Sequence, residues 1–369
     1  MIKSVIGLGF GDEGKGLVTN YLTLKSKNKP LIIRHSGGHQ AGHNVVFNGT
    51  NHIFSNFGSG SPNGADTYWS KYCTVDPVGI INELKELKSK GIDPVLYIDA
   101  DAPITTPYEK YHNVSSTNNL IHGTCGVGFG STFAREEKFY SLTFSDIFYS
   151  WIFEEKMNNI SNYYTFNIND DVMNEFILSI SDIIKYKNNI KLTYGRPMGY
   201  NDIIFEGSQG LLLDQHYGFF PHVTRSNTGT KNIYNIISNK NIEFYLVTRA
   251  YQTRHGNGPM TNTNYDIEIN NINETNVSGG YQGEFKKSIL DVSLLEYGIN
   301  KDKGLRESNN KNLVITCLDH LTEYVFTYNG DMILCDNEKT FIEKISSILK
   351  ITVLISKSNK SEEIKKILN

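Results

Sequence analysis

The sequence predicts an α/β protein with a large, mostly parallel central sheet, a P-loop-like glycine turn near the N-terminus and a helical satellite region. Three observations predict this fold class. The N-terminus shows a strand–turn–helix–strand order. Many parallel sheets begin with this order of elements. Further apolar runs of strand length follow along the chain and end in polar residues. The segment 148–195 has a mostly helical pattern and forms the expected satellite.

The first elements are a strand, a turn, a helix and a second strand. Residues 4–8 form a short apolar run that leads into glycines, which is typical of a buried strand. Leu17, Val18 and Leu22 then recur at helical spacing. A second strand is expected at 31–34, after a proline. In such a sheet ligands bind at the carboxyl ends of the strands.

The middle of the chain alternates helical, extended and glycine-rich segments. An amphipathic helix is expected over 78–90, followed by a buried strand at 95–98. The stretch 123–132 is too rich in glycine for the interior of an element, so a mobile loop is expected there.

The rest of the chain returns to strands. Apolar runs at 202–206, 244–247 and 313–316 predict three more of them. The last forty residues predict a helix, a strand at 351–355 and a further helix. Without an internal repeat or a linker, residues 1–369 are expected to form a single domain.

Composition excludes several classes of protein. With 39% hydrophobic and 20% charged residues, the 369-residue chain can bury a sizeable core. A formal net charge of −3 gives no reason to expect a nucleic-acid groove or binding to an anionic membrane surface. No apolar run reaches membrane-spanning length, and the N-terminus lacks the features of a signal peptide, so a cytoplasmic protein is expected. The scattered cysteines favour neither a disulfide framework nor a zinc site: Cys73, Cys125, Cys317 and Cys335.

Residues 9–16 (GFGDEGKG) are the most informative stretch. Glycines let backbone N–H groups approach phosphates, and the following helix N-terminus favours an anion. A Walker A motif needs Ser or Thr after the lysine, whereas Lys15 is followed by Gly16. Asp12 and Glu13 make electrostatic sense beside a triphosphate if they hold a metal or act as a base. The alternative is a plain strand–helix turn with a solvated acidic pair.

Five collinear segments over the first 260 residues resemble the adenylosuccinate synthetase family. GDEGKG is that family's signature and is not shared by ordinary P-loop NTPases. The other segments resemble its motifs GGxNAGHT, FEGAQGxLLD, YPYVT and AYxTRxGxGP. They are, in the same order, RHSGGHQAGHN at 34–44, FEGSQGLLLD at 205–214, FPHVT at 220–224 and AYQTRHGNGP at 250–259.

The resemblance implies a ligase that uses GTP and Mg²⁺ to join IMP and L-aspartate into adenylosuccinate through a 6-phosphoryl-IMP intermediate, a step of purine biosynthesis. Asp12 would be the general base and would ligate Mg²⁺ together with the carbonyl of Gly42. His43 would stabilise charge at the γ-phosphate, and Lys15 would neutralise the transferred group. A histidine in a glycine-rich loop can also simply cap a turn.

The resemblance also assigns residues to each ligand. Gln40 replaces an asparagine of the family and keeps its amide. Gln209 would contact the base edge, and Thr124 with Thr224 the 5′-phosphate, although Gln209 and Thr224 can equally be turn formers. The expected IMP site is Asp12, Gln40, Thr124, Cys125, Gln209, Thr224 and Arg254. The expected GTP site is Gly11, Asp12, Glu13, Gly14, Lys15, Gly16, Gly42, His43, Asn44, Asp319, Ser356 and Ser358, its guanine-binding part within residues 310–369.

Two loops depart from the family pattern in the nucleotide-binding regions. In 123–130 (GTCGVGFG), Cys125 stands where the family has a phosphate-binding threonine, and thiols are weak donors. The family's dimer-crossing arginine has no clear counterpart, and Arg135 and Lys138 are the nearest basic residues. The guanine-binding TKxD motif becomes TCLD, in which Asp319 can still accept from guanine or can cap the next helix.

The amino-acid loop departs furthest. The family's TTGRxR run corresponds to 279–291 (GGYQGEFKKSILD), where Lys286 and Lys287 could bind the aspartate carboxylate as point charges or form a solvated basic pair. The resemblance implies a homodimer.

Other functions stay open. The same chemistry could act on another purine, such as dGMP, or with another amine donor. The phage enzymes that act on dGMP replace the catalytic aspartate by serine, so Asp12 favours IMP. A P-loop NTPase or kinase lacks support because no Ser or Thr follows Lys15. A non-catalytic nucleotide-binding protein has no use for a base in the phosphate loop.

Overall fold

The computed structural model describes residues 1–116, 124–238, 241–270 and 283–367. Among these residues, ten strands form one central sheet in the order β16-β15-β12-β9-β1-β8-β2-β5-β6-β7. Adjacent strands are parallel except β16, which runs antiparallel to β15. The strands are β1 (Ile2–Gly7), β2 (Leu31–Arg34), β5 (Asp66–Trp69), β6 (Leu96–Asp99), β7 (Ile190–Thr193), β8 (Ile203–Gly210), β9 (Glu243–Arg249), β12 (Lys311–Thr316), β15 (Thr352–Ile355) and β16 (Lys365–Lys366).

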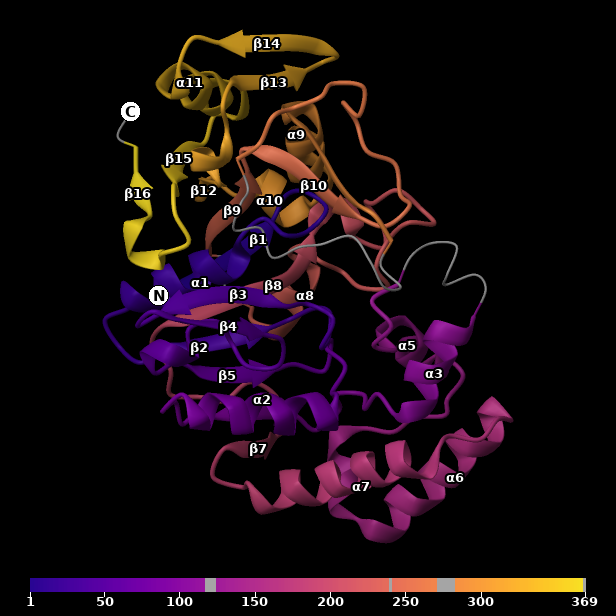
Figure 1. The fold of residues 1–369 in the computed structure, drawn as a ribbon. Coiled ribbons are helices and arrows are strands. Elements are labelled where there is room, and N and C mark those ends of the chain that lie inside the picture. Colours follow the sequence, from indigo (N-terminus) through magenta and orange to yellow (C-terminus); the bar gives the residue numbers. More distant parts are fainter. Residues whose placement is uncertain (117–123, 239–240, 271–282, 368–369) are drawn as a thin grey trace.

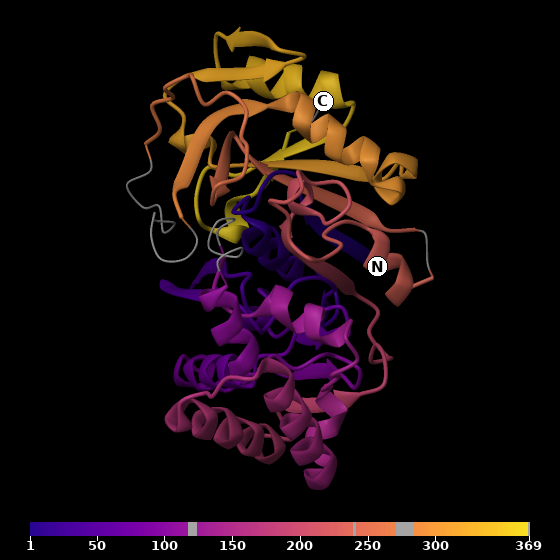
Figure 2. The ribbon, with the colours of Figure 1, turned by 90° about the vertical axis from the view of Figure 1, so that its right-hand side faces the viewer.

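Two smaller antiparallel or mixed units complete the β-structure. A four-stranded sheet consists of β10 (Tyr251–His255), β11 (Phe285–Asp291), β13 (Tyr324–Tyr328) and β14 (Asp331–Cys335). A hairpin consists of β3 (His43–Phe47) and β4 (Thr50–Phe54). The four-stranded sheet lies at one end of the molecule and the satellite helices at the other (Figures 1 and 2).

Helices cover the sheets and build the satellite. The longer ones are α1 (Lys15–Leu24), α2 (Pro77–Ser89), α3 (Pro107–Ser115), α5 (Phe129–Glu136), α6 (Ser150–Tyr164), α7 (Asp170–Lys185), α9 (Val292–Lys301) and α11 (Glu338–Leu349). Shorter helical turns are η1 (Ser61–Asn63), η2 (Phe144–Phe148), η3 (Leu211–Leu213), α8 (Lys231–Ile236), α10 (Lys303–Glu307), η5 (Leu318–His320) and η6 (Ser361–Glu363). None of the described helices combines the length and apolar character needed to cross a bilayer.

The core explains why the first strand is central. Alternate side chains of a strand point to opposite sides of the sheet, and β1 has buried apolar side chains on both sides. Val5 packs with Leu17, Val18 and Leu22 of α1 on one face, whereas Ile6 belongs to the cluster on the other face. The loop between β1 and α1 is therefore held between two rigid elements.

The predicted fold class is confirmed, and three expectations about elements are corrected. The satellite consists of α6 and α7, but residues 190–193 form β7, an edge strand of the central sheet, because the buried Ile190 pairs with Leu96. The glycine-rich stretch at 123–132 already contains the start of α5, and residue 123 lies outside the described residues. The chain ends in η6 and β16 instead of the expected final helix.

Candidate functional site

The candidate site is centred on the loop that joins β1 to α1. β1 lies between β8 and β9, and the chain continues to opposite sides of the sheet from this point. Ligands of open parallel sheets bind at such a switch point, at the carboxyl ends of the strands. Gly11 (φ 104°) and Gly14 (φ 91°) adopt a left-handed backbone there that favours glycine.

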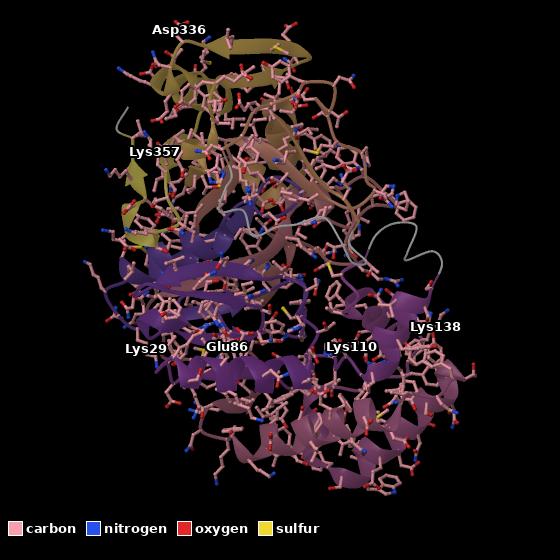
Figure 3. The ribbon with its side chains drawn as sticks, in the orientation of Figure 1. Lys29, Glu86, Lys110, Lys138, Asp336 and Lys357 are labelled. Atoms are coloured by element: carbon pink, nitrogen blue, oxygen red, sulfur yellow. The ribbon has the colours of Figure 1, made fainter. Side chains whose placement is uncertain are left out.

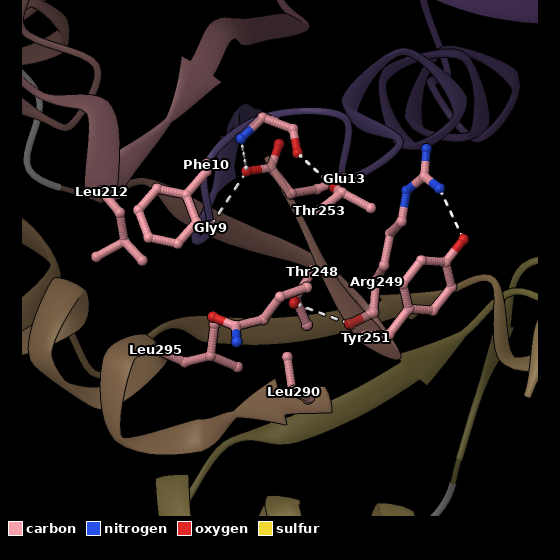
Figure 4. A pocket seen from close by; sticks show the side chains of 12 residues that line it. Gly9, Phe10, Glu13, Leu212, Thr248, Arg249, Tyr251, Thr253, Leu290 and Leu295 are labelled. Carbon is pink, nitrogen blue, oxygen red and sulfur yellow. Dashed lines mark hydrogen bonds between the residues drawn. The ribbon is translucent and has the colours of Figure 1, made fainter. Parts of the chain in front are cut away.

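Glu13 points into the loop. Its carboxylate accepts hydrogen bonds from the N–H groups of Gly9 (3.1 Å) and Gly11 (2.9 Å) (Figure 4). It also pairs with the ammonium group of Lys15. Glu13 and Lys15 are each only 3% exposed. A Cβ on Gly210 would lie 2.4 Å from a carboxylate oxygen of Glu13, so glycine makes room for it.

This inward turn corrects the idea of a solvated acidic pair. Glu13 shapes the loop from within, and the charge of Lys15 is shared with that carboxylate. Asp12 is then the loop acid that faces outward, with 26% of its side chain exposed.

Asp12 contacts residues from a second part of the chain. Its carboxylate lies 3.2 Å from Nε2 of His255, and its carbonyl accepts from Nε of Arg249 at 2.6 Å. Burial alone would raise the pKa of the Asp12 carboxyl, but the hydrogen bond and charge of His255 outweigh it together with the charges of Arg249 and Lys15. The net effect lowers the pKa. Asp12 is therefore ionised and able to accept a proton or bind a cation.

His43 lies over the start of α1 and is held by a buried carboxylate. Its Nδ1 donates to Glu206 at 2.7 Å, and a Cβ on Gly16 would lie only 2.7 Å from Cβ of His43. Burial lowers the pKa of His43, and the neighbouring Glu206 does not cancel this effect, so the imidazole is neutral. Nε2 of His43 is buried without a hydrogen-bond partner among the described residues. This nitrogen is the one that a ligand at α1 can use.

Glu206 is the charged centre beneath His43. Burial would raise the pKa of its carboxyl, but the charge and hydrogen bond of His43, the charge of Arg34 and the hydroxyl of Ser59 lower it to about 2. The guanidinium of Arg34 is fully buried, lies 4.0 Å from Glu206 and packs on Trp69. A buried carboxylate that accepts a hydrogen bond from His43 and lies beside the guanidinium of Arg34 fixes the orientation of the imidazole.

Two glutamine side chains belong to the expected IMP site. Gln40 has both amide atoms, and Gln209 its amide oxygen, buried without hydrogen-bond partners among the described residues. A Cβ on Gly38 would lie 3.0 Å from the amide oxygen of Gln40, which keeps that amide close to the backbone. Buried amide groups are rarely left unpaired, so a polar ligand is the natural partner for them. Ser208, next to Gln209, contacts Ser36 through their hydroxyls at 3.0 Å.

Two other residues of the expected IMP site have hydrogen-bond partners within the protein. The hydroxyl of Thr124 donates to Asn113 (2.7 Å), and the N–H of Thr224 donates to the carbonyl of Leu213 (2.8 Å). Cys125 is exposed.

Arg254 is buried, and its two terminal nitrogens donate to the carbonyls of Pro259 (2.7 Å) and His222 (3.1 Å). Its guanidinium also packs over Phe10, and burial lowers its pKa to about 10. Arg254 therefore braces the loops around the site.

The two lysines expected to bind the amino acid lie on opposite faces of β11. Residues 279–282 of the expected amino-acid loop lie outside the described residues. In the β10–β11 pair, Lys286 stands opposite Arg254 and Lys287 opposite Thr253. Directly paired residues share a face and neighbours in sequence do not. One clamp made of both lysines does not fit this register. Lys287 is on the face of Thr253, whose hydroxyl donates to Gly11 of the loop.

The C-terminal residues of the expected GTP site lie beyond Thr316. The hydroxyl of Thr316 donates to the carbonyl of Glu13 at 2.8 Å, which ties the end of β12 to the loop. Asp319 follows in η5 and is 42% exposed. Ser356 is buried and its hydroxyl donates to the carbonyl of Ser358 (2.8 Å), while its own carbonyl accepts from the N–H of Leu318. Asp319 is thus an accessible polar side chain, whereas Ser358 is partly buried and its hydroxyl accepts from the N–H of Lys360 (3.2 Å).

The solvent exposure of four residues bears on the remaining assignments to the GTP site and to the dimer contact. Gly42 and Asn44 are exposed on either side of buried His43. Arg135 is fully buried, with Nε donating to Glu109 at 2.8 Å, so it cannot reach into a partner subunit. Lys138 is exposed in the turn that follows α5 (Figure 3) and is the basic candidate that remains for a dimer contact.

A magnesium ion fits the donor set of this loop. The described residues contain no group of three or more His, Cys, Asp or Glu side chains arranged to hold a metal. Mg²⁺ is usually bound by one or two carboxylates together with substrate phosphates and water. Asp12 supplies one partly exposed carboxylate, and the carbonyl of the exposed residue Gly42 is the second expected donor.

Sequence reasoning missed three residues of this site. Glu206 belongs to the quoted FEGSQG segment, where an acid at the end of a buried strand was an available signal. Arg249 and His255 contact Asp12 only because β10 folds back over the loop, and nothing in their local sequence indicates this.

The buried His35 gives a prediction about how the stability of the protein depends on pH. Its ring is fully buried on Phe205 with both nitrogens unpaired among the described residues, and burial, followed by the charge of Arg34, lowers its pKa to about 3. An unfolded histidine titrates near 6.5, so the unfolded chain binds an extra proton between about pH 6.5 and 3 and stability falls as pH decreases through this window. We expect His35→Phe to reduce this acid sensitivity by about 1.4 kcal/mol per pH unit below 6.

Denaturant unfolding between pH 7 and 4 measures that effect. The control is His216→Phe, because His216 is an exposed residue of the same type. Parallel stability curves for the wild type and His35→Phe would contradict the prediction.

Fold and site together define a parallel α/β protein with a phosphate-loop-like turn at the switch point of its sheet. A family model described as adenylosuccinate synthetase matches residues 4–326. The chain belongs to the adenylosuccinate synthetase family, as the sequence resemblance predicted.

Relatives named adenylosuccinate synthetase support this membership. The protein of Thermosipho africanus is 33% identical over 318 residues, which cover 81% of this chain and 76% of that protein. The protein of Mannheimia succiniciproducens is 32% identical, covering 72% and 66%, and that of Blochmanniella pennsylvanica is 30% identical, covering 70% and 65%. The matched region thus spans slightly under two thirds of the length of these last two relatives.

Solved structures share the fold. The fully ligated adenylosuccinate synthetase of Plasmodium falciparum superposes with a TM-score of 0.74 at 17% identity, covering all of both chains. The succinoaminodeoxyadenylate synthetase of cyanophage S-2L, bound to dGMP and to dATP as an energy donor, gives 0.65 at 14% identity and covers 100% of this chain and 97% of that one.

Proposed function

We propose that this protein is a GTP-dependent ligase that joins IMP and L-aspartate to form adenylosuccinate in purine biosynthesis. The observation that carries the proposal is the outward, ionised carboxylate of Asp12 in a phosphate loop whose other acid, Glu13, points inward. A loop that only bound phosphate would gain nothing from an outward acid. Family membership and the names of the relatives give independent support.

The proposed reaction has two steps. Asp12 accepts the N1 proton of IMP while O6 attacks the γ-phosphorus of GTP, so that GDP leaves and 6-phosphoryl-IMP forms. The aspartate amine then attacks C6 and displaces inorganic phosphate. His43, oriented by Glu206 through Nδ1, would use its Nε2 to contact a phosphate oxygen, which favours the protonated imidazole. Lys15 adds positive charge beneath the loop.

Mg²⁺ belongs to the proposal, held by the Asp12 carboxylate and the Gly42 carbonyl. When bound there, it would neutralise charge on the phosphates of GTP. A cytoplasmic homodimer is proposed as well, as the sequence resemblance implies, with Lys138 as its exposed basic candidate.

Specificity would reside in polar groups around the loop. Within the described part of the chain, Gln40 and Gln209 have amide atoms without hydrogen-bond partners, which are available for the purine base, and Asp319 is accessible for guanine. Of the two lysines, Lys287 shares a face with the strand residue that contacts the loop, and is the better candidate for the amino-acid carboxylate. A second candidate function is the same chemistry on dGMP, favoured by the fold shared with the cyanophage S-2L enzyme bound to dGMP.

The test offers IMP and dGMP in competition to the purified full chain with GTP, Mg²⁺ and L-aspartate. Mass spectrometry should detect the succinyl product of IMP and release of phosphate that requires aspartate. The succinyl product of dGMP alone would favour the second candidate. Phosphate release without aspartate would refute a ligase and indicate a hydrolase.

Replacing the accessible acid of η5 should alter the choice of triphosphate. A carboxylate at Asp319 can accept from both N1–H and N2–H₂ of guanine, whereas an amide offers one acceptor and an opposing donor. We expect Asp319→Asn to lower kcat/KM for GTP about 10- to 100-fold and to leave the value for ATP nearly unchanged. Steady-state kinetics with both triphosphates measures this. Equal losses for GTP and ATP would place Asp319 outside the base site.

A further inference from the structure

Three residues of the β9–β10 segment contact the tip of the phosphate loop. Nε of Arg249 donates to the carbonyl of Asp12 (2.6 Å), and the hydroxyl of Thr253 donates to the carbonyl of Gly11 (3.3 Å). Nε2 of His255 lies 3.2 Å from Oδ2 of Asp12. Alternate residues of a strand share a face, so Thr253 and His255 reach the loop together. His255 is the member of this group that contacts the Asp12 carboxylate itself.

Asp12 needs such support because its backbone is in the left-handed region (φ 61°), which is costly for a residue with a Cβ. Its carboxylate is also partly exposed, so packing alone does not define its direction. His255 is itself well held. It pairs with Phe285 across the β10–β11 ladder, with ring centroids 4.7 Å apart, and is only 23% exposed.

The sequence makes this contact a property of this particular chain. In the segment that resembles AYxTRxGxGP, His255 occupies the second variable position. The family motif therefore does not require a histidine at the point where the chain meets Asp12.

We propose that His255 is a positioning residue for Asp12: its Nε2–H donates to Oδ2, fixes the carboxylate and leaves the other oxygen directed at the purine. The inference rests on the proposed function, in which Asp12 is the general base. His255 touches no substrate in this role and acts only through Asp12.

Two variants separate hydrogen bonding from packing. His255→Gln keeps an N–H donor and loses the ring, whereas His255→Phe keeps a ring against Phe285 and loses the donor. We expect His255→Phe to lower kcat about 10- to 100-fold with KM for IMP and GTP within about 2-fold, because misplacement of a reacting group by about 1 Å can cost this much. His255→Gln should recover most of the loss. Near-normal turnover of His255→Phe, or equal losses in both variants, would overturn the proposal.

A second measurement does not depend on catalysis. In the full chain labelled with ¹⁵N-histidine, the Nε2 signal of His255, assigned by its absence in His255→Phe, should shift in Asp12→Asn. An unchanged signal would overturn the proposal, since the two side chains would not be paired. A wild-type chain that pairs the two groups but makes no succinyl product would refute the proposed function instead.

Discussion

Asp12→Asn should abolish turnover while leaving triphosphate affinity largely intact. Asparagine keeps the size and hydrogen-bonding oxygen of the side chain but cannot accept a proton at neutral pH. General base catalysis contributes about 100- to 10,000-fold, so a fall in kcat of that order is expected. The inward Glu13 and its bonds to Gly9 and Gly11 are untouched, which preserves the shape of the loop.

Two measurements on Asp12→Asn decide the role of this residue. Steady-state kinetics gives kcat, and calorimetric titration with a non-hydrolysable GTP analogue and Mg²⁺ gives the affinity. Parallel losses of affinity and turnover would mean that Asp12 only holds the metal. Unchanged turnover would refute the base and, with it, the proposed function.

Glu206→Gln should cost both stability and turnover. Breaking a buried ion pair by removing one partner typically costs about 3–5 kcal/mol, because the other charge is left buried. Here Arg34 would lose its nearby anion and His43 the acceptor that orients its ring. Wrong orientation of a catalytic imidazole can cost several orders of magnitude, and we expect kcat to fall at least about 100-fold.

The acid dependence of Glu206→Gln follows from the sign of its pKa shift. A carboxyl whose pKa is lowered to about 2 in the folded state stabilises the fold above its unfolded value near 4.3, and this stabilisation disappears as pH falls toward 2. The free energies of unfolding of the wild type and the variant should therefore converge below about pH 4.

Glu83→Gln is the matched control for this variant. Glu83 is also a buried glutamate and accepts from the N–H groups of Asn56 (2.7 Å) and Phe57 (3.2 Å), without a contact to His43. It should lose stability without a specific loss of kcat at temperatures where the variant is folded. Equal kinetic losses in both variants would mean that Glu206 acts only through stability.

Much of the fold could be predicted because its central strands are buried on both faces. Continuous apolar runs such as 31–34 and 244–247 are the direct signature of that burial, and both became strands of the central sheet. β7 was missed because its four residues follow a long helical segment and become a strand only by pairing with β6. The four-stranded sheet was missed for a similar reason, since its pairing joins residues far apart in sequence.

For the candidate site as well, local features could be predicted from the sequence and long-range contacts could not. Asp12, Lys15 and His43 lie in short segments whose composition already indicates phosphate chemistry. The direction of each side chain could not be predicted, and the two adjacent acids of the loop point opposite ways, with Glu13 onto backbone N–H groups and Asp12 toward His255.

By itself, the sequence determined the α/β fold class, the glycine-rich turn after the first strand and the family, because these follow from local patterns of glycine, charge and apolar residues. Only the tertiary structure decided that Glu206 orients His43 and that His255 meets Asp12. The physical reason is distance along the chain. Glu206 is 163 residues from His43, and such contacts depend on how strands β1, β8 and β10 come together, which no local pattern encodes.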